Sequence, residues 1–504
     1  MGHLLPPGGV FAFLAEHRRD LFGDELFADL FPSGRGRPSV PADVVATVIV
    51  LQALHGLSDR DAADAVTFDL RWKATAGLAV DAASFHPTTL TYWRRRLAAS
   101  DRPNRIFDVV RQVVAETGVL RGKTRRVLDS TILDDAVATQ DTVTQLIAAI
   151  RRVGRVVPDA AAVIEQACYA HDYADPGKPR IAWDDAQARA DLVDALVRDA
   201  HRVLDGLPAA GGDPAEAEVL ALLALIAGQD VEWVPDGDTP SGGVWVIARR
   251  VAPDRVISVH DPDARHAHKT TARRQDGFKA HVVVEPDTGL VTVCAVTRAA
   301  GDGTGDAAAG RVLLATDTTI TAGNSVQVLG DSAYGTGAML AALHTAGHEA
   351  LVKPWPVNPA VPGGFTVDDF TVDHPGRTVT CPAGTTRPVN GDGQVNFGVA
   401  CRGCPLRERC TRSATGKTMR LREHDALQRA HRSRATDPVW VADYRRHRPM
   451  VERTLAWLTR GNRRLRYRGT AKNNAWFGLR AGAVNLRRLL TLGLHRDTAG
   501  WRIA

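Results

Sequence analysis

Three acidic residues occupy positions that suit phosphoryl-transfer chemistry. Asp331 follows a β-forming run at 326–329, and Asp129 follows the apolar pair at 127 and 128. Glu452 lies in a stretch whose apolar residues recur at helical spacing. Mg²⁺ prefers carboxylate oxygens and keeps open positions for phosphate and water. Two such ions, ~3.5–4 Å apart, can hold the attacking and leaving oxygens of a phosphodiester, and these acids suit such a pair.

The same acids also allow a simpler interpretation. Open α/β sheets carry their chemistry at the carboxyl ends of strands, but an acid after a strand is also a common N-cap of the next helix. Asp331 taken alone fits either role, because turn residues are frequent. Asp261 and Asp263 form a further possible metal site, although a polar loop is the simpler explanation.

The motifs around the three acids occur in a recognisable order. LDST surrounds Asp129, GDSAYG surrounds Asp331, and Glu452 lies in YRRHRPMVERTLAWL. Together they resemble the DDE transposases of bacterial insertion sequences, most of all the insertion-sequence family numbered eleven eighty-two. The resemblance extends over nearly the whole chain. It implies a ribonuclease H-like core in which the three acids are catalytic and bind two Mg²⁺, or Mn²⁺, ions.

The resemblance also draws attention to the residues before Glu452. Arg448 precedes this acid by one helical turn, where it can pair with Glu452 or hold a phosphate. The family's signature spaces a Tyr ahead of this Arg and a Lys seven residues after the Glu. Here Tyr444 lies one residue further back and position 459 is Thr, so these two roles do not carry over directly.

The elements that must position the acids form an α/β pattern. Phe278–Glu285 and Leu290–Thr297 alternate like the two strands of a hairpin, with a turn at 286–289. A helix, the strand before Asp331, a second helix and a strand at 348–352 follow. This order is that of a ribonuclease H-like core, and the resemblance makes Lys279 and His281 plausible neighbours of the site.

Helical segments precede and interrupt this core. Ala42–His55 is bounded by Pro41 and Gly56, the expected helix punctuation, and Ser58 begins another helix at 59–66. Four further stretches between 143 and 226 are helical by periodicity. The predicted architecture is an N-terminal helical DNA-binding domain (1–124), the first parts of the core (125–150 and 250–354), a helical insertion (151–249), a cysteine-rich insertion (355–440), and a C-terminal part of the core with the glutamate helix and a basic tail (441–504).

A basic helix is expected at Thr88–Ala99. Arg94, Arg95 and Arg96 adjoin two aromatic residues there, which is compatible with a helix-turn-helix-like DNA reader. In the family that the chain resembles, this region binds the terminal repeats of the element. The alternative is a helical bundle that packs on the core or on another protomer.

Four of the six cysteines gather within 30 residues. Cys401 and Cys404 form a C-x₂-C knuckle, with Cys381 before it and Cys410 after it. Such spacing in a cytosolic protein indicates a structural Zn²⁺ site, and the intervening sequence suits a zinc-ribbon-like fold. The family carries a cluster here as well. The alternative is four reduced structural thiols.

The charge is distributed unevenly along the chain. From Cys401 to Ala504 there are 25 Lys and Arg against 7 Asp and Glu, so this fifth carries +18 and the first 400 residues carry −12 of the overall +6. Such asymmetry indicates a polyanionic partner. A basic block follows the third acid and is expected to bind phosphates; its arginines are Arg463, Arg464, Arg466 and Arg468.

Composition limits the location of the protein. The sequence shows neither a signal-peptide pattern nor an apolar run long enough to cross a bilayer, and its cysteines do not form a disulfide framework. We therefore expect a cytoplasmic, nucleoid-associated bacterial protein that does not bind membranes.

The sequence thus predicts a transposase that binds double-stranded DNA at the element's ends, cleaves phosphodiesters and transfers the 3′-hydroxyl ends into target DNA. Because two ends must be cut together, a homodimer or higher oligomer is expected. The alternatives are a ribonuclease H-like nuclease without strand transfer and a domesticated, non-catalytic DNA-binding protein.

Overall fold

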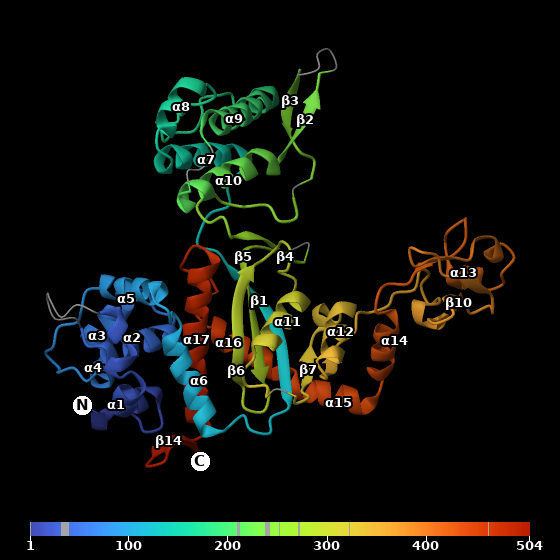
Figure 1. Cartoon of the computed structure of the whole chain (residues 1–504). Coiled ribbons are helices and arrows are strands. Elements are labelled where there is room, and N and C mark those ends of the chain that lie inside the picture. The colour runs from blue at the N-terminus through green and yellow to red at the C-terminus, as the bar shows by residue number, and fades with distance from the viewer. Residues whose placement is uncertain are drawn as a thin grey trace.

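The computed structural model describes residues 2–31, 40–208, 212–236, 242–250, 252–270, 273–321, 323–461 and 463–504. Its centre is a six-stranded mixed sheet (Figure 1). The strands are β1 (Arg125–Asp134), β4 (Arg265–Thr270), β5 (Arg273–Glu285), β6 (Leu290–Arg298), β7 (Gln327–Gly330) and β8 (Glu349–Val352). They run in the order β4-β5-β1-β7-β8, and β6 also pairs with β5. β5 is antiparallel to its neighbours, whereas β1, β7 and β8 are parallel.

Helices cover both faces of the sheet, which confirms the predicted α/β class. Val127 and Leu329 face a cluster shared with α16 (Pro449–Thr459) and α17 (Thr470–Thr491). Leu128 and Val328 face the opposite cluster, shared with α11 (Asp306–Thr316) and α12 (Gly337–Thr345). This division follows from the alternation of side chains along each strand, and it decides which residues can meet at the site.

The long helix α17 closes the edge of the sheet at β6. An edge strand leaves backbone N–H and C=O groups without a ladder partner. The Asn485 side chain accepts from the Val291 amide and donates to the Val291 carbonyl, both at 2.8 Å. The Val296 amide donates to Asn474 at 2.9 Å. Two asparagines of α17 therefore form hydrogen bonds with backbone groups of the edge strand β6 and hold the helix against it.

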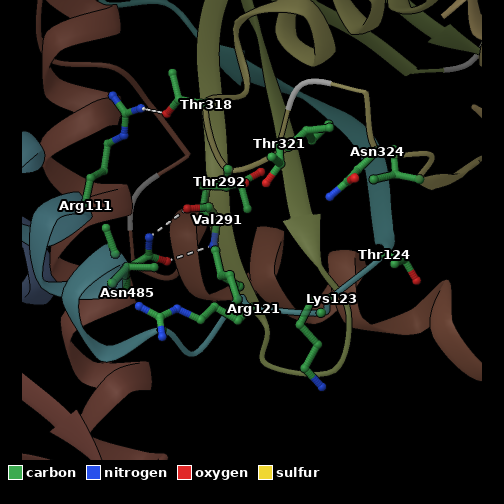
Figure 2. A pocket seen from close by; sticks show the side chains of 18 of the residues that line it. Arg111, Arg121, Lys123, Thr124, Val291, Thr292, Thr318, Thr321, Asn324 and Asn485 are labelled. Carbon is green, nitrogen blue, oxygen red and sulfur yellow. Dashed lines mark hydrogen bonds between the residues drawn. The ribbon is translucent and has the colours of Figure 1, made fainter. Parts of the chain in front are cut away.

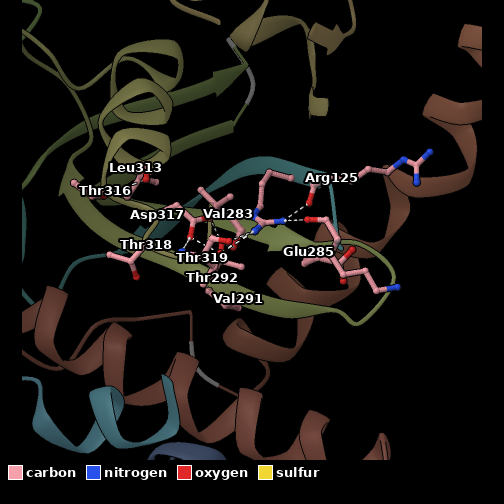
Figure 3. A network of polar contacts seen from close by, with 12 residues as sticks. Arg125, Val283, Glu285, Val291, Thr292, Leu313, Thr316, Asp317, Thr318 and Thr319 are labelled. Atoms are coloured by element: carbon pink, nitrogen blue, oxygen red, sulfur yellow. Dashed lines mark hydrogen bonds and ion pairs between the residues drawn. The ribbon is translucent and has the colours of Figure 1, made fainter. Parts of the chain in front are cut away.

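A buried ion pair ties β1 to the end of α11. The Arg126 Nε donates to Asp317 at 3.0 Å, and both side chains are fully buried. Asp317 also accepts from Thr292 at 2.7 Å, and Arg126 donates to the Thr319 hydroxyl at 2.8 Å. Figure 3 shows Asp317, Thr292 and Thr319 gathered in this network. Such pairing is what makes two buried charges tolerable.

The N-terminal region is helical, as predicted. Its helices are α1 (Val10–Leu21), α2 (Ala42–His55), α3 (Asp59–Phe68), α4 (Leu70–Ala76), α5 (Thr88–Ala99) and α6 (Arg105–Thr117). Ser58 and Asp61 form the expected capping box of α3. The apolar residues of these helices join those of α17 and of the C-terminal hairpin β14 (Leu494–Asp497) and β15 (Gly500–Ile503) in one cluster.

A second helical unit separates β1 from the rest of the sheet (Figure 1). It contains α7 (Thr142–Val156), α8 (Ala160–Ala167), α9 (Ala186–Gly206), α10 (Pro214–Gln229) and a hairpin of β2 (Val231–Pro235) and β3 (Gly243–Ile247). Apolar residues of α7, α9 and α10 form a cluster of their own. Buried Arg255 joins Asp230 at 2.7 Å where the unit returns to the core.

Between β8 and the last helices the chain forms a small β-rich unit, on the right of Figure 1. Its elements are β9 (Thr371–Asp373), β10 (Thr378–Thr380), β11 (Thr386–Pro388), β12 (Gln394–Asn396), α13 (Arg407–Cys410) and β13 (Thr418–Arg420). Helices α14 (Asp425–Arg434) and α15 (Pro438–His447) lead back to α16. Over the described residues no single helix has the length and apolarity to cross a membrane, and one sharply bent pair, α2 with α3, passes that test by length and composition only.

Candidate active site and nucleic-acid interface

Asp129 and Asp331 are brought together by the register of two parallel strands. Val127 of β1 pairs with Leu329 of β7. Asp129 lies two residues further along β1, on the same face as Val127, and Asp331 directly follows the last residue of β7. β7 ends at Gly330, whereas β1 continues to Asp134. The sequence suggested that Asp129 lies at the end of a strand, whereas the structure places it inside β1. Asp129 does lie at the point beyond which β1 no longer pairs with β7.

The turn after β7 depends on a close approach of an aromatic ring. Asp331 N-caps the short 3₁₀ helix Ser332–Tyr334 and accepts from the Ala333 amide at 2.9 Å. Tyr334 packs back over Gly330, where an added Cβ would lie 3.0 Å from the ring. The sequence left two roles open for Asp331, as a helix cap and as a site residue. The structure shows the cap, which uses only one of the two carboxylate oxygens.

Arg448 links the first and third acids. Its Nη2 lies 3.0 Å from Asp129 Oδ2, and its Nη1 lies 3.7 Å from Glu452 Oε1. Pro449 begins α16, so Arg448 N-caps the helix that carries Glu452. The side chains of Arg448 and Asp129 are 9% and 14% exposed, whereas that of Glu452 is 66% exposed. The closer partner of Arg448 is thus Asp129, which the sequence did not indicate.

Burial and neighbouring charges shift the pKa values of Asp129 and Arg448 in opposite directions. Burial raises the pKa of Asp129 above its ordinary value, Arg448 opposes the rise, and Asp331 adds to it. Burial by itself lowers the pKa of Arg448, but Asp129, Tyr444 and Glu452 raise it above its ordinary value. Burial also raises the pKa of Tyr444, which stacks on Trp440 at 5.4 Å beside Arg448. The site is a compact set of mutually dependent charges.

Lys279 and His281 lie on the other face of the sheet. His281 pairs across the ladder with Ser130, so it shares the face of Ser130 and not that of Asp129. There Lys279 Nζ and His281 Nδ1 lie 3.4 and 3.7 Å from Asp306 Oδ1. They lie on the strand that pairs with β1, but their side chains and that of Asp129 are on opposite faces of the sheet.

Asp261 and Asp263 hold a helix end. Asp261 accepts from the Gly469 amide at 3.1 Å, and Asp263 accepts from the amide and hydroxyl of Thr470 at 2.9 Å. Thr470 begins α17. The alternative metal site considered from the sequence is therefore a cap, which satisfies amides at the helix N-terminus.

The predicted basic helix α5 uses two of its three arginines internally. Arg94 pairs with Asp59 and lies over the ring of Tyr467. Arg96 donates to the Leu30 carbonyl and to Tyr92. Arg95 is exposed. Of the three, Arg95 has the side chain most available to a partner.

The basic block after α16 contacts two parts of the molecule. The Arg463 carbonyl accepts from the Asp134 amide at 3.0 Å, and the Leu465 amide donates to the Asp134 carbonyl at 2.8 Å. Arg464 donates to the Asp135 carbonyl, and Arg466 to the Gly56 carbonyl. The side chains of the four arginines are exposed, at Arg463, Arg464, Arg466 and Arg468. The block thus borders both the end of β1 and the N-terminal helices.

The four clustered cysteines line one small cavity. Cys381, Cys401, Cys404 and Cys410 surround a space of about 20 Å³. Burial raises the pKa of Cys410, and the neighbouring thiols add to the rise. Across the described part of the chain, however, no three or more His, Cys, Asp or Glu side chains are grouped in a way that could hold a metal ion.

A larger pocket lies at the opposite end of the sheet from the acids. It has a volume of about 460 Å³ and is lined by Arg111, Arg121 and Lys123, with Asn485 at one side (Figure 2). Thr124 and Val326, which precede β1 and β7, also line it. It therefore opens at the amino ends of these strands, away from Asp129 and Asp331.

Comparisons with known proteins identify the class of the chain. Residues 380–490 match the model of a family described as Transposase DDE domain, and residues 6–96 match one described as Transposase domain (DUF772). No curated protein and no solved structure matches the chain. The mixed α/β core and these two matches define a DDE transposase, with the ribonuclease H-like core that this class implies.

More particularly, the chain is a transposase of the insertion-sequence type, an enzyme that cleaves and transfers DNA. Such enzymes use divalent Mg²⁺ or Mn²⁺ and act on DNA. The match at 380–490 includes Glu452 and the four clustered cysteines, whereas neither match includes Asp129 or Asp331.

Proposed function

We propose that Asp129, Asp331 and Glu452 form the catalytic site of this transposase and bind two divalent ions. The observation that supports this proposal is the position of Arg448, which lies 3.0 Å from Asp129 and 3.7 Å from Glu452. Strand register brings Asp129 beside Asp331, and Arg448 joins Asp129 to the helix of Glu452. The donor set is purely carboxylate, which suits Mg²⁺ or Mn²⁺.

The electrostatics of the acids fit a cation. Two carboxylates side by side, one of them largely buried, need positive charge to remain ionised together. Arg448 supplies one such charge to Asp129. The carboxylate of Asp331 then remains available to bind a metal ion. When bound, the ions supply Lewis-acid stabilisation of the phosphodiester and a more acidic water. The chain's own residues hold the carboxylates in place and keep them partly shielded from solvent.

Arg448 is suited to a second task, to hold the scissile phosphate. Its Nε and Nη1 are buried and form no hydrogen bond within the described part of the protein. Unpaired buried donors are costly, so such groups usually await a partner. A phosphate beside the acids would accept from one of these two donors, in a charge-assisted hydrogen bond that is stronger than a neutral one.

The reaction proposed is cleavage at the ends of the element followed by transfer of the freed 3′-hydroxyl to target DNA. Both steps are in-line displacements at phosphorus, so one site performs both. The basic block and Arg95 are proposed to bind the phosphates of the duplex. Because two ends are processed together, a homodimer or larger assembly on DNA is proposed.

A structural Zn²⁺ is proposed for the cysteine-bearing unit. All four cysteines line one cavity, and among the described residues the apolar cluster of this unit contains five buried ones. Four thiolates are a usual tetrahedral donor set for zinc, and such sites stabilise small units directly.

The experiment that tests the proposed function is a Mg²⁺-dependent strand-transfer assay on DNA that carries the element's own ends. Wild-type protein should give joined product. Asp331→Asn should bind the same DNA and give none. Cleavage without joining by the wild type would favour a nuclease instead.

A further inference from the structure

The helical unit between β1 and β4 is fixed to the basic block by one short loop. The Arg152 Nη1 of α7 donates to the Val259 carbonyl at 2.9 Å. Two residues later, Asp261 accepts from the Gly469 amide at 3.1 Å. His260 stands between these two anchor points, with α7 on one side and the basic block on the other.

These anchors bring exposed arginines from distant parts of the sequence to the same place. Arg468 directly precedes Gly469 and is exposed. Arg155 follows Arg152 by three residues on α7, so both lie on one face of the helix, and Arg155 is exposed. Burial lowers the pKa of His260, and Arg468, Arg155 and Arg152 lower it further. The three arginines thus all lie near this histidine.

The acids around this group do not neutralise the two exposed arginines. Glu218 pairs with Arg152 at 3.1 Å. Asp261 is buried and directed at backbone amides, and Asp263 pairs with Arg298 at 3.0 Å. For Arg155 and Arg468 the described residues offer no ion pair. Two exposed arginines without an ion pair attract a polyanion.

We propose that Arg155 and Arg468 form one continuous surface that binds the backbone phosphates of duplex DNA, so that the helical unit is a DNA-binding element. The proposal rests on the proposed DNA contact of the basic block and extends it to a region whose sequence carries no DNA-binding motif. Phosphate contacts of this kind are independent of sequence. The buried ion pair of Arg255 and Asp230 joins the unit to the segment that returns to the core.

The test is the salt dependence of duplex binding by Arg155→Gln, Arg468→Gln and the double variant. Each phosphate contact contributes about 0.9 to the slope of log affinity against log salt concentration. Each single variant should lower the slope by about 0.9 and the double variant by about 1.8. The loss should be equal on element ends and on unrelated duplex.

The matched control is Arg121→Gln, which removes the same charge from an exposed arginine at the other end of β1; it should leave the slope unchanged. A wild-type slope for Arg155→Gln, with a lowered slope for Arg468→Gln, would overturn the inference but leave the basic block as a DNA contact. Wild-type slopes for both would also overturn the inference and would exclude Arg468 as a phosphate contact. A change in self-association of Arg155→Gln without any change in slope would assign the surface to a second copy of the chain and also overturn the inference.

Discussion

Arg448 donates to Asp129 across 3.0 Å and stands one helical turn before Glu452, which it approaches to 3.7 Å. A single cation therefore holds the carboxylate of a β-strand and orients the helix that bears another. Pro449 makes this possible, because α15 ends and α16 begins at this point.

Arg448→Lys should retain the fold but lose most of the cleavage activity. Lys presents one compact ammonium and cannot make the forked contacts of a guanidinium. Loss of a positioned donor in an active site costs about 10²–10³-fold in rate, and we expect a loss of this order. The rate of end cleavage under single-turnover conditions measures it.

The control for Arg448 is Arg453→Lys, a change at an exposed position on the same helix. It should cleave at nearly the wild-type rate. If both variants, or neither, were impaired, the specific role of Arg448 would be wrong.

Asp317→Asn should strongly destabilise the protein without touching the acids. It leaves Arg126 buried without its counter-charge, and breaking a buried ion pair costs about 3–5 kcal/mol. Denaturant unfolding measures the loss. Joint replacement by Arg126→Met and Asp317→Leu should recover much of it, because no charge is then left unpaired. A double variant less stable than the single one would contradict this account.

His281 should make the stability of the core depend on pH. Burial lowers its pKa to about 4, from an ordinary value of 6.5. The unfolded chain therefore binds this proton more readily than the folded one. The contribution of neutral His281 is fully present above about pH 6.5 and is lost as the pH falls towards 4.

His281→Gln should flatten this part of the stability profile between about pH 6.5 and 4, as measured by thermal unfolding. Asp306 and Lys279 face His281 and remain in the variant. An unchanged slope in this window would show that these neighbours, and not the histidine, set the dependence.

Protein purified without chelator should contain about one zinc per chain. Cys404→Ser should lose the metal and unfold the cysteine-bearing unit at a lower temperature, since metal binding stabilises such units. Cys294→Ser, which changes a thiol outside this unit, should retain the metal. Well under one zinc in the wild type would contradict the site and favour four reduced thiols.

The sequence indicated the local features of the fold more readily than its long-range contacts. The apolar runs before Asp129 and Asp331, and the hairpin of β5 and β6, follow from alternation and turn residues. β1 was expected to end at Asp129, because the residues that follow are mostly polar; the structure extends it to Asp134, paired with β5 and then with the basic block.

Contacts between distant segments left no local signal. Arg94 forms an ion pair with Asp59, so part of the expected DNA-binding helix stabilises its own domain. Asp261 caps a helix that begins more than 200 residues later. Neither partner could be chosen from spacing, because each depends on how separate helices pack.

The central claim is that Asp331 belongs to the catalytic site, and a strand-transfer assay with Asp331→Asn tests it most directly. The control is Asp287→Asn, which removes a carboxylate at the hairpin turn where it pairs with Lys123. We predict joined product from wild type and from Asp287→Asn in Mg²⁺, and none from Asp331→Asn although it still binds the ends. Joined product from Asp331→Asn at the wild-type rate would contradict the account.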